Sequence, residues 1–362
     1  MKTITVGITG TKGKTTVAHL IRGILNEAGI RTGLVSTIEV DTGLRCIPAV
    51  NTTPPHDKLM EYVKEMDEAG CQIRIIEVSS IGLKEQRVTD LWFDYGMFTN
   101  MGVDHIGPGE HDSFEEYFYW KKQLFKQCDV GIFHMEDPYY PAIAQEATCR
   151  IMGYCKDEEN LSSLTVLPGD FNRENARGAI TLCRELGVSD AIIRKALPKI
   201  YVKGRMEHLQ LPDGRLVILD YAHNGMALEQ ALKMLKARTK GKVICLFGCG
   251  GNRSVLRRSG MGETAGTYAD ETIITSDNPR WEEPLEIIDD IVAGMKKTNG
   301  SYTVIPDRRE AIAEGIRRLT LDDVLLLAGK GHETYQLIRG VRYEMDERKI
   351  VEEIVNSAMK SE

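Results

Sequence analysis

The chain has 362 residues, enough for two or three domains that each bury a core. Hydrophobic residues make up 42% and charged residues 27%, as in soluble globular proteins, and the formal net charge of −7 argues against a nucleic-acid partner held by bulk charge. No apolar run reaches membrane-spanning length, no leader-type segment opens the chain, and the eight cysteines lack zinc-ligand spacing. We therefore expect a cytoplasmic protein without a membrane partner.

A glycine-rich loop follows the first apolar segment and precedes a stretch, 17–25, with apolar residues at helical spacing. Backbone amides of such a loop bind phosphates, Lys14 would reach the outer phosphates, and the Thr15 hydroxyl would bind Mg²⁺. Ile8 stands where the strict P-loop pattern has its first glycine. A plain glycine turn with a solvated lysine is the alternative, which the strand–loop–helix context disfavours. The predicted ATP-binding residues here are Gly10, Thr11, Lys12, Gly13, Lys14, Thr15 and Thr16.

Further along, short apolar runs alternate with amphipathic segments. The run 73–78 reads as a buried strand, 97–101 as the end of another, and 114–125 as a helix. Such alternation predicts a mostly parallel sheet with helices on both faces and ligands at the carboxyl ends of the strands. The expected fold class is α/β, with a P-loop ATPase domain over 1–203.

A second α/β domain, Rossmann-like, is expected over 204–362. Four strand-like runs each end in a polar or glycine-rich cluster, which predicts a site along the strand ends. The runs are 216–219, 242–247, 271–275 and 324–328.

Two residues of the first domain have metal-binding chemistry. Glu77 closes the strand 73–78, where a carboxylate can bind Mg²⁺, although a solvated strand-end glutamate is the simpler interpretation of that residue alone. His105 follows Asp104 after another strand and is either a metal ligand or a helix-cap partner.

Lys121 shares a helical face with Tyr117, Leu124 and Phe125, so we expect it to point inward. A buried unpaired ammonium is costly, and burial favours the neutral amine. A neutral amine can take up CO₂ as a carbamate, which would turn a cation into a metal-binding anion. Lys122 reads as a solvated neighbour.

Arg205 and Glu207 lie at the expected domain junction. Arg205 is predicted to bind a γ-phosphate from across a cleft. The alternative is a surface ion pair between Arg205 and Glu207.

Twelve motifs in order along the whole chain resemble those of the Mur ligase family, closest to its MurE branch, which adds the third peptide residue to UDP-N-acetylmuramoyl-dipeptide. They are Gly-Thr-x-Gly-Lys-Thr-Thr (10–16), Asn-Thr-Thr-Pro (51–54), Glu-Val-Ser-Ser (77–80), Gln-Arg-Val (86–88), Phe-Thr-Asn…Asp-His (98–105), Tyr-x-x-x-Lys-x-x-Leu-Phe (117–125), Gly-Asp-Phe-Asn-Arg-Glu-Asn (169–175), Gly-Arg-Met-Glu (204–207), Asp-Tyr-Ala-His (220–223), Phe-Gly-Cys-Gly-Gly-Asn-Arg (247–253), Asp-Asn-Pro-Arg (277–280) and Gly-Lys-Gly-His-Glu-Thr-Tyr (329–335).

The resemblance implies an ATP-dependent amide-bond ligase. ATP phosphorylates a carboxylate, an amine attacks the acyl phosphate, and ADP and phosphate leave. Lys14, Glu77, His105, Lys121 and Arg205 would be the catalytic residues. Thr15 and Glu77 would bind one Mg²⁺, and His105 and carbamylated Lys121 would hold a second together with Glu77. Further nucleotide contacts implied by the family are Asn175, Arg205, Asp220 and His223.

The resemblance also places the substrates. Asp277-Asn278-Pro-Arg280 is the family signature for meso-diaminopimelate, with Arg280 pairing with a carboxylate. Gly329 and Glu333 would bind the distal amino-acid end, and Trp281 has no assigned role. The acceptor would contact Asn51, Thr52, Thr53, Ser79, Gln86 and Arg87.

The chain departs from the family in three places. Its phosphate loop begins at residue 7, so we expect the N-terminal UDP-sugar-binding domain to be missing and UDP-muramoyl-dipeptide to be a poor acceptor. Ile81 replaces the usual histidine after Glu-Val-Ser-Ser, and 102–113 resembles the metal-site loop only loosely. The expected acceptor is a free peptide, a polymer end, or a carboxylate presented by a partner protein.

Two other functions stay open. One is a two-domain ligase such as a folylpolyglutamate or cyanophycin synthetase, although Asp-Asn-Pro-Arg and Gly-Lys-Gly-His-Glu argue against the folate type. The other is a non-catalytic nucleotide-binding subunit, which the presence of Lys14, Glu77, His105 and Lys121 disfavours.

Overall fold

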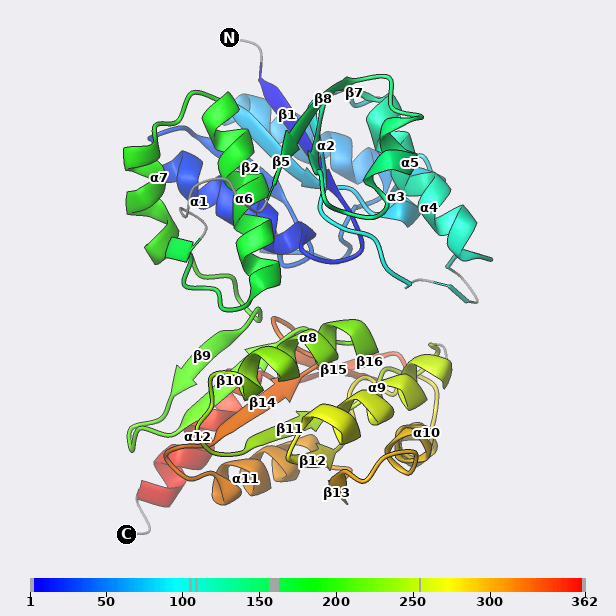
Figure 1. The fold of residues 1–362 in the computed structure, drawn as a ribbon, viewed down its shortest axis with the longest axis vertical. Coiled ribbons are helices and arrows are strands. Elements are labelled where there is room, and N and C mark those ends of the chain that lie inside the picture. Colours follow the sequence, from blue (N-terminus) through cyan, green and yellow to red (C-terminus); the bar gives the residue numbers. More distant parts are fainter. Residues whose placement is uncertain (1–2, 104–105, 108–109, 156–162, 254, 360–362) are drawn as a thin grey trace. The chain divides into compact units, whose positions relative to one another are not determined.

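The computed structural model (Figure 1) describes residues 3–103, 106–107, 110–155, 163–253 and 255–359. The chain divides into two compact units, Met1–Val202 and Lys203–Glu362. This division falls one residue before the boundary expected from the sequence.

Unit 1 is built on an eight-stranded sheet of order β4-β3-β2-β5-β1-β6-β7-β8 within the described residues. All neighbouring strands are parallel except the β2–β3 and β3–β4 pairs, which are antiparallel. The strands are β1 (Ile4–Thr9), β2 (Thr32–Val35), β3 (Glu39–Asp41), β4 (Cys46–Pro48), β5 (Ile73–Glu77), β6 (Phe93–Phe98), β7 (Cys128–His134) and β8 (Arg150–Tyr154).

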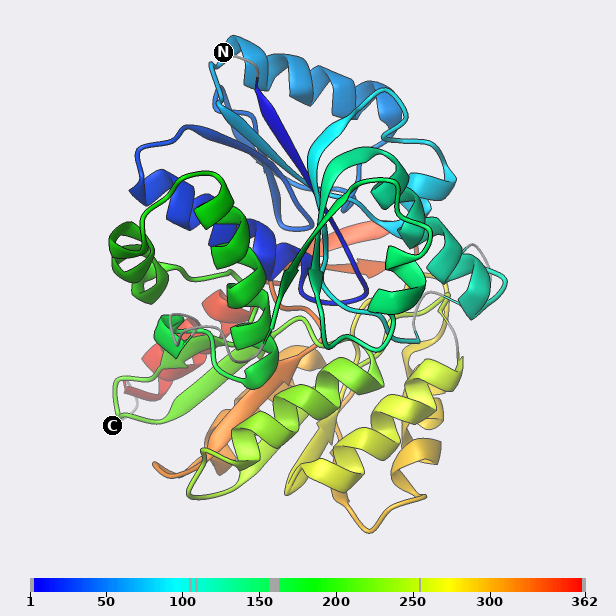
Figure 2. The same cartoon turned by 45° about the horizontal axis from the view of Figure 1, so that its top comes forward.

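Helices cover both faces of this sheet, because each presents one apolar stripe to it (Figures 1 and 2). Helices α1 (Lys14–Glu27), α6 (Asp170–Glu185) and α7 (Asp190–Ala196), with the 3₁₀ turn η3 (Leu197–Lys199), bury their apolar residues on one face. Helices α2 (His56–Glu68), α3 (Ser80–Lys84), α4 (Phe114–Lys122) and α5 (Tyr140–Ala144), with η1 (Gln123–Lys126), cover the other.

Strand β1 is central, and this places the loop after it at the middle of the sheet's carboxyl edge. It pairs in parallel with β5 on one side and β6 on the other, with Ile8 opposite both Glu77 and Met97. Gly7 allows this close packing, since a Cβ there would lie 2.7 Å from the ring of Phe93. Burial of apolar side chains of α1, such as Leu20 and Ile24, stabilises the fold by about 1.5–3 kcal/mol for each side chain.

The described part of unit 2 has a six-stranded sheet of order β13-β12-β11-β14-β10-β9, parallel except for the β9–β10 pair, and a separate antiparallel hairpin. The sheet strands are β9 (Glu207–Gln210), β10 (Leu216–Asp220), β11 (Val243–Phe247), β12 (Glu271–Ile274), β13 (Ser301–Val304) and β14 (Val324–Ala328). The hairpin is β15 (Tyr335–Ile338) with β16 (Val341–Glu344).

The helices of unit 2 also bury apolar stripes. Leu228 and Leu232 of α8 and Ile287 and Ile291 of α10 are buried. Residues of α11 and α12 pack with those of β10, β11, β12 and β14 in one core cluster. The helices are α8 (Gly225–Lys236), α9 (Val255–Tyr268), α10 (Pro284–Met295), α11 (Arg308–Arg318) and α12 (Glu347–Met359).

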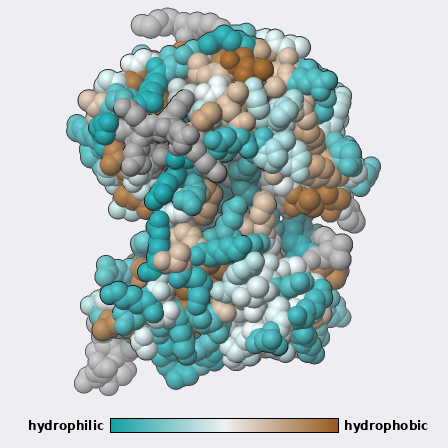
Figure 3. All heavy atoms as spheres, viewed as in Figure 1, coloured by the Kyte–Doolittle hydropathy of each residue, from teal (hydrophilic) through white to brown (hydrophobic). Residues whose placement is uncertain are grey.

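The predicted α/β class with a mostly parallel sheet is confirmed. The surface visible in Figure 3 is mostly hydrophilic on both units, with separate hydrophobic patches. Among the described residues, none of the helices combines the length and apolar character needed to cross a bilayer.

Candidate active site

The loop after β1 has the backbone of an anion-binding cradle. Gly10 (φ 142°) and Gly13 (φ 85°) both lie in the left-handed region that favours glycine. A Cβ at Gly10 would overlap with Thr99 Oγ1, and one at Gly13 would overlap with Asn175 Oδ1. Gly13 is also the N-cap of α1, so the loop leads directly into a helix N-terminus. The residues present therefore fit a nucleotide phosphate.

Residues that follow strand β6, together with Tyr117 of α4, hold this loop in place. Asn100 O accepts from Thr11 N (2.9 Å), and Asn100 Oδ1 accepts from Lys12 N (2.9 Å). Thr99 Oγ1 donates to Lys12 O (2.5 Å), and Tyr117 donates to Thr11 Oγ1 (3.0 Å). These bonds preorganise the loop, so little ordering is left for phosphate binding.

Two lysines converge on one carbonyl of the loop. Lys14 Nζ donates to Gly10 O (2.7 Å), and Lys121 Nζ donates to the same oxygen (2.8 Å). Lys121 is 1% exposed, which confirms that it points inward, and its Nζ lies 4.6 Å from the centre of the Tyr117 ring. Lys122, expected to be solvated, is instead half-buried and pairs with Glu146.

Glu77 is fully buried at the end of β5 and is not a solvated strand end. Its Oε2 accepts from the hydroxyls of Thr15 and Thr37 (both 3.1 Å), and its Oε1 accepts from Thr37 N (2.9 Å). A carboxylate beside a P-loop hydroxyl is the oxygen-ligand arrangement that suits Mg²⁺. His105 lies outside the described residues. Within the part of the chain that is described, His, Cys, Asp and Glu form no group of three with metal-binding geometry.

The structure brings four of the predicted acceptor residues together beside Glu77. Thr53 Oγ1 donates to Glu77 O (2.9 Å) and contacts Ser79 Oγ (3.1 Å), and Arg87 Nη1 donates to Thr53 O (2.6 Å). The Thr52 hydroxyl lies 3.0 Å from that of Thr37. The other two, Asn51 and Gln86, are exposed, and Gln86 has a left-handed backbone (φ 56°).

Two residues of this region escaped the sequence-based prediction. Thr37 follows the buried strand β2 and contacts Glu77 through both its backbone and side chain. A polar residue just after a buried strand is the signal that marks it. His111 is fully buried, its Nε2 lies 2.9 Å from Ser80 Oγ, and its ring packs against Tyr117. No sequence signal distinguishes His111 from the glycine-rich segment around it.

The Gly13 cradle yields a test. Gly13→Ala should lower ATP affinity about tenfold or more, because the new Cβ overlaps with Asn175 Oδ1 in a left-handed backbone. Gly29→Ala is the matched control, since Gly29 (φ 75°) has nothing within 4 Å of a new Cβ. Calorimetric titration with ATP measures both. Equal affinities for the two variants would contradict a tight phosphate cradle at Gly13.

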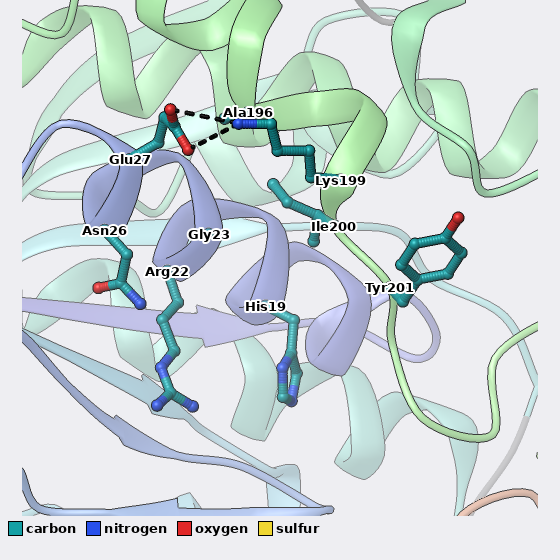
Figure 4. A pocket seen from close by; sticks show the side chains of 9 residues that line it. All are labelled: His19, Arg22, Gly23, Asn26, Glu27, Ala196, Lys199, Ile200 and Tyr201. Atoms are coloured by element: carbon teal, nitrogen blue, oxygen red, sulfur yellow. Dashed lines mark hydrogen bonds and ion pairs between the residues drawn. The ribbon is translucent and has the colours of Figure 1, made fainter.

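A separate cavity of about 300 Å³ lies along the second half of α1 and does not include the loop. Figure 4 shows that Glu27 and Lys199 face each other across one side of it. Its charged groups have partners in unit 1, with Lys199 3.3 Å from Glu27 and Arg22 2.6 Å from Glu39. The lining residues are His19, Arg22, Gly23, Asn26, Glu27, Ala196, Lys199, Ile200 and Tyr201.

In unit 2, Arg205 lies over an aromatic ring instead of pairing with Glu207. Its guanidinium carbon is 4.7 Å from the centre of the Tyr221 ring, and Glu207 binds Arg348 (2.8 Å). Asp220 accepts from Met206 N and Ala222 N (both 2.8 Å), so its carboxylate fixes the turn that carries Arg205. His223 Nδ1 lies 2.8 Å from Tyr221 O.

A second polar cluster lies at the carboxyl ends of β12 and β14. Asn278 Nδ2 donates to Glu333 Oε2 (2.8 Å), and Lys330 Nζ donates to Asn278 Oδ1 (3.1 Å) and Glu333 Oε2 (3.2 Å). Lys330 is fully buried and was not predicted as a site residue. Gly329 (φ 109°) lets the chain pass close to Asp277, whose Oδ2 would be 2.9 Å from a Cβ there.

Arg280 is held beside this cluster by the hairpin. Its N–H donates to Leu337 O (2.9 Å), and its Nη1 donates to Gly251 O (2.7 Å). Arg280 has a left-handed backbone (φ 56°), and burial together with the charge of Arg253 lowers its pKa. A half-buried guanidinium near a second cation is suited to binding a carboxylate. Trp281 is 71% exposed.

Comparison with known proteins identifies the family. Residues 8–166 match the Mur ligase middle domain, and residues 204–331 match the "Mur ligase, glutamate ligase domain". A "UDP-N-acetylmuramoyl-L-alanyl-D-glutamate--2,6-diaminopimelate ligase" of Caldanaerobacter subterraneus subsp. tengcongensis is 38% identical, over 98% of this chain and 78% of the relative. The chain belongs to the Mur ligase family. A Clostridium tetani ligase of the same name is 37% identical, over 97% of this chain and 77% of that protein.

Solved structures show the same fold. A ligase of the same diaminopimelate-adding name has a TM-score of 0.63 and 27% identity, covering 99% of this chain and 79% of that one. A Mycobacterium tuberculosis folylpolyglutamate synthase, crystallised with ADP and AMPPCP, has a TM-score of 0.71 at 14% identity, over 91% of this chain and 89% of its own. At that identity the likeness concerns the fold alone. The predicted family, fold class and ligase class are thus confirmed, and the family uses ATP and Mg²⁺.

Proposed function

We propose that this Mur ligase joins an amino group of a diamino dicarboxylic acid, such as meso-diaminopimelate, to a carboxylate acceptor. The carrying observation is the Arg280 guanidinium held beside Asp277, Asn278 and Glu333 at the strand ends of unit 2. Arg280 matches one carboxylate of such a substrate, while the carboxylates of Asp277 and Glu333 match an ammonium group. Relatives at 37–38% identity that carry the diaminopimelate name support this choice.

In the proposed reaction an acceptor carboxylate oxygen attacks the γ-phosphorus of ATP, and the bond to ADP breaks. The substrate amine then attacks the acyl carbon, phosphate leaves with the bond electrons, and the amine proton passes to solvent. Lys14 and the loop amides would hold the phosphates in place. Mg²⁺ would neutralise the charge that develops on the phosphoryl oxygens.

We propose two Mg²⁺ ions at this loop. Thr15 and Glu77 would hold one, supported by their 3.1 Å contact. Glu77, His105 and a carbamate on Lys121 would hold the other, supported by the burial of Lys121 beside the loop. Asn175, Arg205, Asp220 and His223 are proposed as further nucleotide contacts, Asp220 by fixing the turn that carries Arg205.

For the acceptor we propose Asn51, Thr52, Thr53, Ser79, Gln86 and Arg87. The support is the hydrogen-bonded group formed by Thr53, Ser79 and Arg87 next to Glu77. The hydroxyls of Thr53 and Ser79 and the guanidinium of Arg87 are hydrogen-bond donors, which suit a carboxyl group.

The test is phosphate release from MgATP over a matrix of amines and acceptors, with products identified by mass. The amines are meso-diaminopimelate, lysine, glutamate, aspartate and arginine; the acceptors are UDP-muramoyl-dipeptide and free short peptides. We expect an amide product with diaminopimelate. A product with glutamate and none with diaminopimelate would replace the proposal by the folylpolyglutamate-type alternative.

Arg280→Met should raise KM for diaminopimelate about 30-fold or more, corresponding to ~2 kcal/mol for a lost guanidinium–carboxylate pair. KM for lysine, which has no distal carboxylate, should change far less. Arg339→Met is the matched control, because Arg339 also has a left-handed backbone (φ 48°) in the hairpin turn but is exposed and pairs with Glu283. Equal KM increases for the two amines would rule out carboxylate selection by Arg280.

A further inference from the structure

We propose that Lys330 is a positioning residue for the amine substrate: its buried ammonium joins the loop after β12 to the loop after β14 and supplies the cation between Asp277 and Glu333. The inference rests on the proposed function, because it concerns the groups that would bind the amine. Lys330 itself is buried behind those groups and is not proposed to touch the substrate.

The geometry places Lys330 at the centre of the cluster. Its Nζ donates to Asn278 Oδ1 (3.1 Å) and Glu333 Oε2 (3.2 Å), and it lies 3.9 Å from Asp277 Oδ1. Asn278 Oδ1 also accepts from Leu337 N (2.9 Å), which ties the cluster to the hairpin. One side chain thus fixes three groups that come from two different loops.

The charges explain why a lysine is needed there. Asp277 and Glu333 place two carboxylates close to each other in a buried cluster, and like charges at short range oppose ionisation. A fully buried ammonium is itself costly unless it is paired and hydrogen-bonded, and Lys330 has both kinds of partner. The Lys330 ammonium therefore lies between the two carboxylates and offsets part of their mutual repulsion.

The pKa of Glu333 depends on this arrangement. Burial, helped by the charge of Asp277, holds the pKa of Glu333 above its ordinary value, and the charge of Lys330 and the hydrogen bond from Asn278 offset part of that rise. Removing the Lys330 charge should therefore raise the pKa of Glu333 again, so that it takes up a proton at a higher pH. Among the described residues, the titratable or charged groups that interact electrostatically with Glu333 include Asp277 and Arg280 after β12, Lys330 after β14, Tyr335 of β15, Tyr221 after β10 and Arg308 of α11.

The experiment compares Lys330→Met, Lys330→Gln and Lys330→Arg in the full chain. Lys349→Met is the control, since Lys349 is an exposed lysine of unit 2 whose partner is Glu344. The first readout is the pH profile of kcat/KM for meso-diaminopimelate, beside KM for ATP. The second is a ¹³C-carboxyl NMR titration of Glu333, which needs no substrate.

We expect both neutral variants to fold, to raise KM for the amine about tenfold or more, and to move the acidic limb of the profile up by about one pH unit. KM for ATP should stay unchanged, and Lys330→Arg should restore most of the loss. The Glu333 titration should move to higher pH in the neutral variants and not in Lys349→Met. The Glu333 titration tests the effect of Lys330 without any substrate. If wild-type protein shows no diaminopimelate-dependent turnover, the proposed function fails, but the titration still decides the role of Lys330.

Three results would overturn the inference. One is an unmoved Glu333 titration in a folded neutral variant. Another is an amine KM and pH profile within about twofold of wild type. The third is unfolding of both neutral variants while Lys330→Arg stays folded, since that would make the role of Lys330 structural.

Discussion

Replacing Lys14 with methionine should lower kcat/KM for ATP about 10³-fold or more, the scale of losing a charge-stabilising group in a transition state. Lys14 Nζ lies over the loop at Gly10 O (2.7 Å) and Thr11 O (3.2 Å), within the cradle that would receive the phosphates. Methionine keeps the length and apolar stem of the side chain but removes the cation. The measurement is steady-state phosphate release with saturating amine and acceptor.

Lys64→Met is the control for this experiment. Lys64 is a 79% exposed lysine of α2 in the same unit, 3.8 Å from Glu68, and its loss should leave turnover within about twofold of wild type because exposed ion pairs contribute little. If Lys14→Met retained a tenth or more of wild-type kcat/KM, the loop would not act as a P-loop in this protein.

Replacing Lys121 with alanine should lower Mg²⁺-dependent turnover about 10³-fold, because the proposed carbamate ligand of the second ion is lost. Acetate or propionate should restore part of the activity, since a small carboxylate can occupy the space of the missing carbamate. In wild-type protein, ¹³C-bicarbonate should give a carbamate signal in the carbon NMR spectrum that is absent from Lys121→Ala.

Lys122→Met is the matched control, one residue along the same helix, with its ion pair directed to Glu146. The Lys122→Met variant should keep wild-type turnover, and added acetate or propionate should not change that turnover. The unmodified amine of Lys121 donates to Gly10 O (2.8 Å). The experiment therefore also tests whether Lys121 acts as an amine and not as a carbamate. Rescue by short alkylamines instead of carboxylates would show that Lys121 acts as a cation that braces the loop, and it would refute the carbamate.

Sequence patterns located the elements well where their signals are local. The helix expected over 114–125 is α4, Phe114–Lys122, continued by the 3₁₀ turn Gln123–Lys126. The strand expected to end at Met101 ends at Phe98 in β6. Thr99 and Asn100 leave the sheet because they hydrogen-bond to the phosphate loop, and apolar periodicity does not register such a contact.

The sequence by itself determined the phosphate loop, the inward direction of Lys121 and the polar clusters after the strands of unit 2, because each depends on residues within one or two helical turns or one strand. Only the tertiary structure showed that the Asn175 side chain packs against Gly13, that Thr37 binds Glu77, and that Lys330 is buried between two loops. These contacts join segments that lie far apart in the chain. The last two form where parallel strands bring their carboxyl ends to one edge of a sheet, and the first forms because α6 packs beside α1 on the same face. The spacing of residues in a linear sequence carries no record of which strand ends become neighbours.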